Sequence, residues 1–523
     1  MTHHDGDWGI LSTQQDENQA RAKAVSDPAA YHAAIAAKEL HWYDTRGEQW
    51  VSQPGADAWQ GWHAASGAEG SADASWTPWS SSLDANAAPF YRWFVDGQTN
   101  ACFNLLDRHV LSGRGKNQAL VFEGDRWDPS KNEGRGGPVF EQRLSYRELL
   151  VEVALRARVL KSLDLSAGDR IALNLPNILE QIFYILAAQR LGVIYTPVFG
   201  GFSAKTLSDR IHDAGAKVVI TADGGYRNAE VVPYKTTYTD PALDNYVPRP
   251  AALQALSETL KSRLPADVAE RLETQVTEAV AGEITLERAD VMRELGLALE
   301  RERGTAPEII AELRTTVASE LAGVSHAVTN VIVVRYTGND IVEHSRDRWS
   351  HDLVDEVEEA FLADAGVADR ASLDSFDDNA FWKAIGAAMP AVPVEADWPL
   401  FIIYTSGSTG KPKGVVHTHG GWLSGITHTM RTVFNANQDD CLYVIGDPGW
   451  ITGQSYLIAA PLAFGMSTVI AEGSPLFPHA GRFASIIERN QVTLFKAGST
   501  FLKAVMTDPA SAQEMSRYDM STL

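Results

Sequence analysis

The sequence predicts an α/β protein built on mixed, mostly parallel sheets flanked by helices. Between residues 168 and 223, short runs rich in valine, isoleucine and leucine alternate with longer segments of helical length. Strands that alternate with helices form β-α-β units, whose successive strands are parallel. A further apolar run at 400–404 ends abruptly in glycine, hydroxyl and lysine residues, which predicts another strand that leads into a binding loop.

Individual elements follow from local patterns. We expect strands at 170–175, 193–198, 217–221 and 442–445, and helices at 28–39, 178–191 and 204–213. The glycine-containing turn 199–203 follows a strand, where folds of this class place loops that face a ligand. Ser203 is equally suited to cap the helix that comes next.

Composition and apolar periodicity change along the sequence, and these changes predict four regions. They are an N-terminal wrap (1–85), a first α/β part (86–247), a helical insertion (248–326) and a second α/β part (327–523). Within the insertion, apolar residues recur at helical spacing, as at Leu253, Leu256, Leu260 and Leu264, which predicts a helical hairpin or small bundle. The insertion serves either as a docking surface for a partner or fused domain, or as an extension without such a role.

The composition narrows the possible partners and the compartment. A net charge of −22 argues against nucleic acid and anionic membranes, because a negative field repels both. The N-terminus lacks the pattern of a signal peptide, and no apolar run is long enough to span a bilayer. The two cysteines, Cys102 and Cys441, lie far apart and form no CxxC pair. We therefore expect a cytoplasmic protein with no membrane partner, no disulfide framework and no zinc site.

The most informative stretch is Tyr404-Thr-Ser-Gly-Ser-Thr-Gly-Lys-Pro-Lys-Gly414, which predicts a loop that binds a polyphosphate. Glycines let backbone N–H groups approach phosphate oxygens closely, while hydroxyls and lysines add donors and positive charge. The predicted binding residues are Thr405, Ser406, Gly407, Ser408, Thr409, Gly410, Lys411 and Lys413. The stretch is not a Walker A loop, because Gly-x-x-x-x-Gly-Lys-Ser/Thr does not fit and Pro412 disfavours a helical conformation at Lys411.

This stretch resembles the signature of adenylate-forming enzymes, and the segments 91–109 and 446–456 resemble the acetyl- and propionyl-CoA synthetase branch. The resemblance implies the large N-terminal domain of an enzyme that joins a carboxylic acid to coenzyme A through an acyl-adenylate, with ATP, Mg²⁺ and CoA as cofactors. Negative charge builds on the departing pyrophosphate, so fixed donors and cations lower the barrier. We assign that catalytic role to Lys413, Ser408 and Thr409.

The resemblance also implies where the acid and CoA bind. Trp450, Ile451, Thr452 and Gln454 correspond to the acyl pocket, whose bulky residues favour a short acid. Gln454 departs from the family pattern, which has histidine there. Relatives carry two arginines for the CoA phosphates; only Arg227 is present here, and Glu230 reverses the charge at the second position. The wrap and the insertion look most like the ligase portion of propionyl-CoA synthase, a fusion with hydratase and reductase domains, which implies 3-hydroxypropionate or propionate as the acid.

Other readings remain open at this stage. A stand-alone enzyme similar to acetyl-CoA synthetase is the alternative within the ligase class, whereas an NTPase or kinase would release ADP and phosphate. A third class is a non-catalytic scaffold that binds nucleotide or CoA. Relatives also have a small C-terminal domain, which we expect to be absent here, so that the isolated chain binds ATP weakly and makes almost no acyl-adenylate. Further catalytic domains, fused or docked, and a homo-oligomer are compatible with this reading.

Two histidines resemble a metal site only superficially. His417 and His419 lie two residues apart in a segment predicted to be a strand, which would place both side chains on one face. No third ligand lies nearby in the sequence, and structural or catalytic zinc sites use three or four protein ligands. We therefore predict no metal held by protein ligands.

Overall fold

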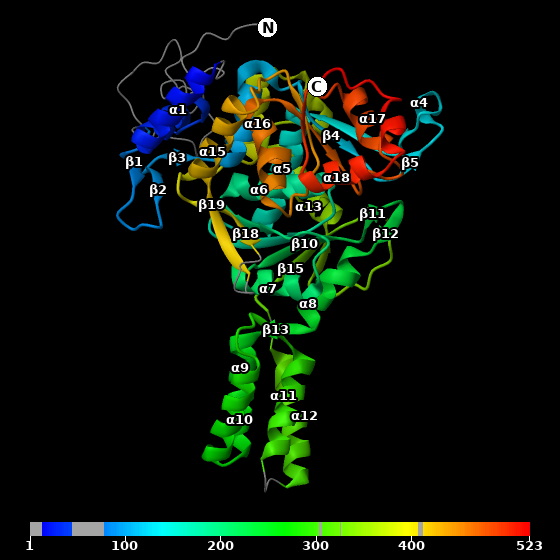
Figure 1. Ribbon diagram of the computed structural model, residues 1–523. Coiled ribbons are helices and arrows are strands. Elements are labelled where there is room, and N and C mark those ends of the chain that lie inside the picture. Colours follow the sequence, from blue (N-terminus) through cyan, green and yellow to red (C-terminus); the bar gives the residue numbers. More distant parts are fainter. Residues whose placement is uncertain (1–12, 44–77, 303–305, 325, 406–411) are drawn as a thin grey trace.

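Two sheets form the frame of the molecule (Figure 1). The computed structural model describes residues 13–43, 78–302, 306–324, 326–405 and 412–523. The larger sheet has seven strands in the order β16-β15-β10-β8-β9-β18-β19, parallel except for the pair β18 and β19. Their bounds are β8 Arg170–Asn174, β9 Ile194–Pro197, β10 Val218–Ala222, β15 Asn330–Val334, β16 Asp347–Trp349, β18 Pro399–Thr405 and β19 Lys413–Thr418. The predicted strands at 170–175, 193–198 and 217–221 are confirmed to within one residue at each end.

The second sheet has five strands in the order β22-β20-β21-β4-β7. It is parallel except for the pair β4 and β7. The strands are β4 Gln118–Glu123, β7 Glu141–Ser145, β20 Cys441–Val444, β21 Ser467–Ala471 and β22 Leu494–Lys496. The mostly parallel α/β architecture predicted from the sequence is therefore confirmed.

Helices separate and cover the sheets. Helices α5 (Tyr146–Ser162) and α6 (Leu179–Leu191) pack together between them, and α6 is buried almost all round, as a helix between two layers must be. Alternate strand residues face opposite sides: Ile220 joins the core with α5 and α6, whereas Val219 joins the core under α7 (Ala204–Ala214) and α8 (Asp240–Asp244). Helix α17 (Gly481–Asn490) covers the outer face of the five-stranded sheet.

The remaining elements surround this frame. They are the helices α13 Ser350–Asp364, α14 Asp378–Ala388, α15 His419–Thr432, α16 Ala460–Phe464, α18 Ser499–Thr507 and α19 Ser511–Met515, and the short pieces β3 Gln98–Thr99, β5 Trp127–Asp128, α4 Lys131–Gly134, β6 Gly137–Pro138, β11 Gly225–Arg227, β12 Glu230–Val232 and β17 Val394–Glu395. Single helical turns lie at Phe103–Asp107, Val110–Arg114, Lys235–Thr239, Arg370–Ser375 and Gly453–Ala459.

The described part of the N-terminal region contains the predicted helix and two elements that the sequence did not predict. Helix α2 (Pro28–Glu39) has the predicted bounds, and the Asp27 side chain caps it by accepting the Ala30 N–H at 2.9 Å. A further helix, α1 (Gln14–Ser26), precedes it, and the hairpin β1 (Ser81–Asp84) and β2 (Arg92–Val95) follows. Most of the chain between α2 and β1, residues 44–77 of the predicted wrap, lies outside the described residues.

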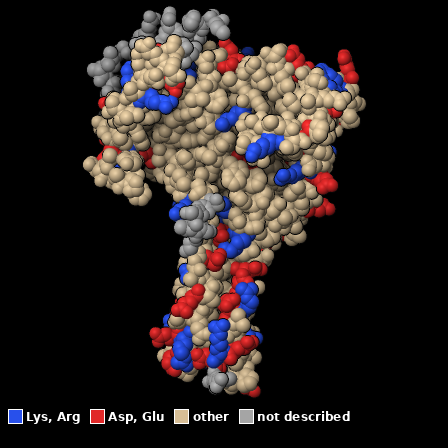
Figure 2. Space-filling model, in the orientation of Figure 1, with Lys and Arg blue, Asp and Glu red and all other residues tan. Residues whose placement is uncertain are grey.

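Four helices project from the body as a stalk, which we define as residues 246–324 (Figure 1). They are α9 Arg249–Arg263, α10 Ala266–Ala279, α11 Arg288–Arg301 and α12 Pro307–Gly323, and the two-stranded pair β13 (Tyr246–Pro248) and β14 (Thr285–Glu287) joins them to the body. Every residue of the stalk core lies between 247 and 324. Charges of both signs are interspersed along its surface (Figure 2). The helical spacing read from residues 253–264 is therefore confirmed as helix.

Candidate active site

The stretch predicted to bind a polyphosphate connects two paired strands, β18 and β19. Strand β18 runs into the loop and β19 runs out of it antiparallel, so that Thr405 lies opposite Lys413. Both residues are exposed at this root of the loop. The predicted binding residues Ser406, Gly407, Ser408, Thr409, Gly410 and Lys411 lie outside the described residues. Of the predicted binding residues in this stretch, Thr405 and Lys413 are described, and the structure pairs them across the two strands.

Helix α7 holds the strand that enters the loop. The Tyr404 hydroxyl donates a hydrogen bond to Asp213 Oδ2 at 2.7 Å, and the Arg210 guanidinium lies over the Tyr404 ring, 5.3 Å from its centroid. Burial, together with this bond, raises the pKa of Tyr404 above its ordinary value, so the hydroxyl keeps its proton. Tyr404 is thus fixed at both its ring and its hydroxyl.

The predicted acyl-pocket residues lie in a segment that follows β20 and packs against the turn after β9. The Trp450 ring, 46% exposed, lies 5.7 Å from Phe199 and 5.5 Å from Phe202, both in the turn 199–203. Gly449 permits this approach, because a Cβ there would lie only 2.5 Å from Phe199 Cα. Ile451 is also exposed and Thr452 half-buried. The two segments follow the carboxyl ends of strands from different sheets, so an aromatic surface forms where the two sheets meet.

Gln454 has a structural role that the sequence does not reveal. Its side chain is 1% exposed, its Oε1 accepts the Tyr195 hydroxyl at 2.8 Å, and its Nε2 donates to the Pro448 carbonyl at 2.6 Å. These bonds tie the acyl-pocket segment to β9. With two partners and 1% exposure, the amide is held in place as part of the structure.

Arg227 lies on the hairpin of β11 and β12, directly opposite Glu230, and both side chains are exposed. The hairpin turn is made by Asn228 and Ala229, with φ of 55° and 64°. Nearby, burial raises the pKa of Asp447 to about 6, and the positive charge of Arg227 partly opposes this shift. The predicted CoA-binding arginine is thus close enough to Asp447, which precedes the predicted acyl-pocket residues, for their charges to interact.

Two buried carboxylates, which the sequence did not single out, accept several hydrogen bonds near the carboxyl ends of β10 and β21. Asp223 accepts the backbone N–H groups of residues 224 and 336–339 at 2.7 to 3.2 Å. Glu472 accepts the Tyr226 N–H and the Tyr336 hydroxyl, each at 2.7 Å. The available signal was an acidic residue placed directly after a buried strand, which both positions share.

The two histidines singled out from the sequence do not share a strand, which corrects that expectation. His417 lies on β19 and stacks on Phe401 with ring centroids 4.6 Å apart. His419 is the first residue of α15, where its Nδ1 accepts the Ala101 N–H at 3.0 Å. Burial lowers the pKa of His419 to about 3, so it is neutral near pH 7.

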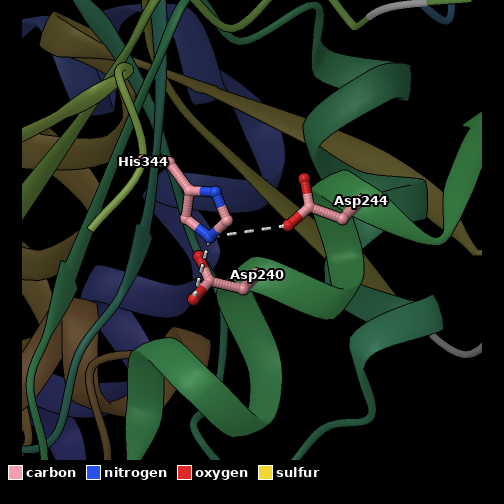
Figure 3. A group of neighbouring side chains, drawn as sticks. All are labelled: Asp240, Asp244 and His344. Atoms are coloured by element: carbon pink, nitrogen blue, oxygen red, sulfur yellow. Dashed lines mark ion pairs between the residues drawn. The ribbon is translucent and has the colours of Figure 1, made fainter. Parts of the chain in front are cut away.

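Elsewhere, Asp240, Asp244 and His344 place their ligand-type atoms within 4.8 Å of one another (Figure 3). Both carboxylates already have cationic partners. Lys235 Nζ lies 2.9 Å from each oxygen of Asp240, and Arg346 donates to both oxygens of Asp244 at 2.7 and 2.9 Å. Ion pairs therefore account for this cluster without a metal ion.

Within the described residues, no helix is both long enough and apolar enough to cross a membrane. The chain belongs to the family of AMP-binding enzymes, whose model matches residues 126–301 and 311–523. In addition, residues 71–105 match the model of the acetyl-coenzyme A synthetase N-terminus.

Curated relatives share the name acetyl-coenzyme A synthetase. The chain is 32% identical over 450 residues to that of Cupriavidus metallidurans and 33% identical over 448 residues to that of Thiobacillus denitrificans. It is 34% identical over 451 residues to that of Methylobacillus flagellatus. These alignments cover 85 to 86% of this chain and 50% of each relative. The chain thus spans about half the length of the curated relatives it matches.

Proposed function

We propose that this chain provides the nucleotide, acid and CoA contacts of an ATP-dependent short-chain acyl-CoA ligase. In the proposed reaction a carboxylate attacks the α-phosphorus of MgATP and releases pyrophosphate, and the CoA thiol then displaces AMP from the acyl-adenylate. The observation that carries the proposal is the hydroxyl, glycine and lysine loop held between β18 and β19, in a chain whose family is defined by AMP binding. The names of the relatives favour the same reaction class.

The charge on this loop explains its role in the proposed reaction. Pyrophosphate departs with more negative charge than it carries in bound ATP, and cations that meet the new charge lower the barrier. Lys413 supplies such a cation from the root of the loop, opposite Thr405. Ser408, Thr409 and Lys411 would complete the set, and Mg²⁺ enters with ATP as part of the substrate. The chain itself has a net charge of −22, so a local group of cations is needed to attract a polyanion.

The acid is proposed to be a three-carbon one, 3-hydroxypropionate or propionate, in a module that works with hydratase and reductase domains. Exposed Trp450 and the rings of Phe199 and Phe202 offer an apolar surface to a short chain. Because the Gln454 amide already has two partners, Thr452 is the better candidate to bind a hydroxyl group. Acetate is the second candidate, favoured by the names of the relatives.

The experiment that separates the possible reactions is a product assay on the complete gene product that carries this chain. Acetate, propionate, 3-hydroxypropionate and butyrate are each supplied with MgATP and CoA, and pyrophosphate, AMP, ADP and phosphate are quantified. The proposal predicts acid-dependent pyrophosphate and AMP in equal amounts, highest with a three-carbon acid. ADP and phosphate would indicate an NTPase or kinase, the absence of turnover would indicate a scaffold, and a preference for butyrate would contradict the short-acid pocket.

Variants of the loop test the roles of single residues. Lys413→Ala and Ser408→Ala should lower kcat for pyrophosphate release by roughly 100-fold while the KM for the acid changes little, because both groups act on charge that appears in the transition state. Lys383→Ala, which removes an exposed lysine of α14, is the matched control and should turn over at the wild-type rate. An unchanged kcat in Lys413→Ala would remove that residue from the proposed mechanism.

A further inference from the structure

Arg210 is a buried cation that lies between the two halves of the candidate active site. Its side chain comes from α7, the residue is 6% exposed, and its Nη1 donates to the Thr206 carbonyl at 2.9 Å. Within the described part of the chain, Arg210 forms no ion pair with a carboxylate. The two acidic residues next to it on the helix are engaged elsewhere: Asp209 pairs with Lys205 at 2.8 Å, and Asp213 accepts the Tyr404 hydroxyl.

Two aromatic rings take the place of a carboxylate around this cation. The guanidinium carbon lies 4.6 Å from the centroid of the Phe202 ring and 5.3 Å from that of Tyr404. A cation over the face of a ring is attracted by the negative potential of that face, and the attraction is stronger when water is excluded. A single guanidinium therefore holds one ring from the acid side and one ring from the nucleotide side.

The contacts continue beyond both rings. On the acid side, Phe202 packs against Trp450 with centroids 5.5 Å apart, and Trp450 is one of the predicted pocket residues. On the nucleotide side, Tyr404 is followed at once by Thr405, the last residue of β18 and the first of the polyphosphate-binding loop. The series Trp450, Phe202, Arg210 and Tyr404 thus connects the acid-binding segment with the root of that loop through direct contacts.

We propose that Arg210 is a positioning residue that couples binding of the acid to binding of ATP. The proposal rests on the function proposed above. An acid bound against Trp450 would fix the position of the Phe202 ring, and the fixed ring would hold the Arg210 guanidinium. Arg210 would in turn hold the Tyr404 ring, and with it the end of β18 that leads into the loop. Such coupling is reciprocal, so acid and nucleotide tighten each other's binding by the same factor.

The test compares the Kd of a non-hydrolysable ATP analogue, α,β-methylene-ATP, without acid and with saturating propionate, in the complete gene product. In the wild type we expect propionate to tighten analogue binding at least five-fold, within the usual range of such couplings. In Arg210→Met, which keeps length but loses charge, the ratio should fall to about one. Arg210→Lys should retain part of it, because a point charge matches two ring faces less well than a planar guanidinium.

A matched control removes a ring-stacked arginine that lies far from this series. Arg335 lies over the Trp349 ring, 4.2 Å from the centroid, at the opposite edge of the seven-stranded sheet from β18 and β19. Arg335→Met should keep the wild-type ratio. Melting curves of each variant establish that the fold persists, and if Arg210→Met does not fold, Phe202→Leu provides the same test because it breaks the next contact.

The possible outcomes are distinct. The proposal is supported if the ratio of analogue Kd without and with propionate is about five or more in the wild type and falls to one in Arg210→Met. The double variant Arg210→Met with Phe202→Leu should then give the same ratio as Arg210→Met alone. A wild-type ratio of one, or an unchanged ratio in Arg210→Met, overturns it even if the enzyme releases pyrophosphate normally. If no acid supports pyrophosphate release by the wild type, the proposed function itself fails, and the coupling proposal fails with it.

Discussion

Replacing Gly449 by alanine should force apart the two segments that form the aromatic surface. A Cβ at position 449 would lie 2.5 Å from Phe199 Cα and 2.6 Å from its backbone nitrogen, whereas ordinary van der Waals contact begins near 3.4 Å. The turn 199–203 would have to move by about 1 Å, and its neighbours here are backbone atoms that cannot rotate away. Overpacking of this kind costs about 1 to 3 kcal/mol of folding free energy.

The functional cost should be larger than the loss of stability suggests. A displacement of about 1 Å in groups that position a substrate can lower a rate roughly 100-fold. We therefore expect Gly449→Ala to raise the KM for the acid and to lower kcat/KM for pyrophosphate release by about one to two orders of magnitude. Urea unfolding and the kinetic assay, performed on the same preparation, measure the two effects separately.

Gly425→Ala is the matched control. Gly425 lies within α15, and a Cβ there would meet no atom within 4 Å. Alanine in a helix interior is favoured over glycine by about 0.5 to 1 kcal/mol, so this variant should be slightly more stable than the wild type and equally active. If Gly449→Ala also unfolds at or above the wild-type urea concentration and keeps its KM, the two segments are not in the close contact that the argument requires.

Two further predictions concern stability. Arg190 and Asp107 form a bidentate pair at 2.7 and 3.1 Å with each side chain 1% exposed, so Asp107→Asn should destabilise the fold by about 3 to 5 kcal/mol in urea unfolding, because it leaves a buried charge unpaired. The exposed pair of Arg348 with Glu356 is the comparison, and Glu356→Gln should cost less than about 1 kcal/mol; equal losses would contradict the reasoning. Burial lowers the pKa of His419 to about 3, whereas the pKa of histidine in an unfolded chain is about 6.5. As the pH drops, the unfolded state therefore binds the proton first. The free energy of unfolding falls between about pH 6.5 and 3, by at most about 1.4 kcal/mol per pH unit. His419→Gln should remove this part of the pH dependence, and parallel melting-temperature profiles of the two proteins between pH 7 and 5 would argue against it.

Local patterns were enough to predict many of the elements but not their long-range partners. The strand at 170–175 and the helix at 28–39 follow from periodicity and caps within a few residues, and both are confirmed. Ser203 caps α7 by accepting the Thr206 N–H, one of the two roles considered for it. The helix α1 was missed, because its sequence is polar and has no apolar face to mark it.

The site shows the same limit. The amide of Gln454 is bonded to Tyr195, which is 259 residues away, and no local signal identifies that partner. The sequence predicts His417 and His419 on one strand, whereas β19 ends at Thr418 and α15 begins at His419. The sequence does not distinguish Arg210 from other helical arginines, because its contacts with the rings of Phe202 and Tyr404 appear only in the structure. The assignment of residues 406–411 to the loop stays a prediction from the sequence motif.

The stalk has a consequence for how mutations accumulate in this protein. Its buried apolar side chains form a core that is separate from the core of the body. A substitution that destabilises the stalk core should therefore change the stability of the sheets little. Hydrogen exchange should therefore report two cooperative units, with amides of α10 and α12 opening at a lower free energy than those of α6. Substitutions such as Leu272→Ala would melt the stalk and leave the body folded. We therefore expect substitutions in the described core of the stalk to leave the stability of the two sheets almost unchanged.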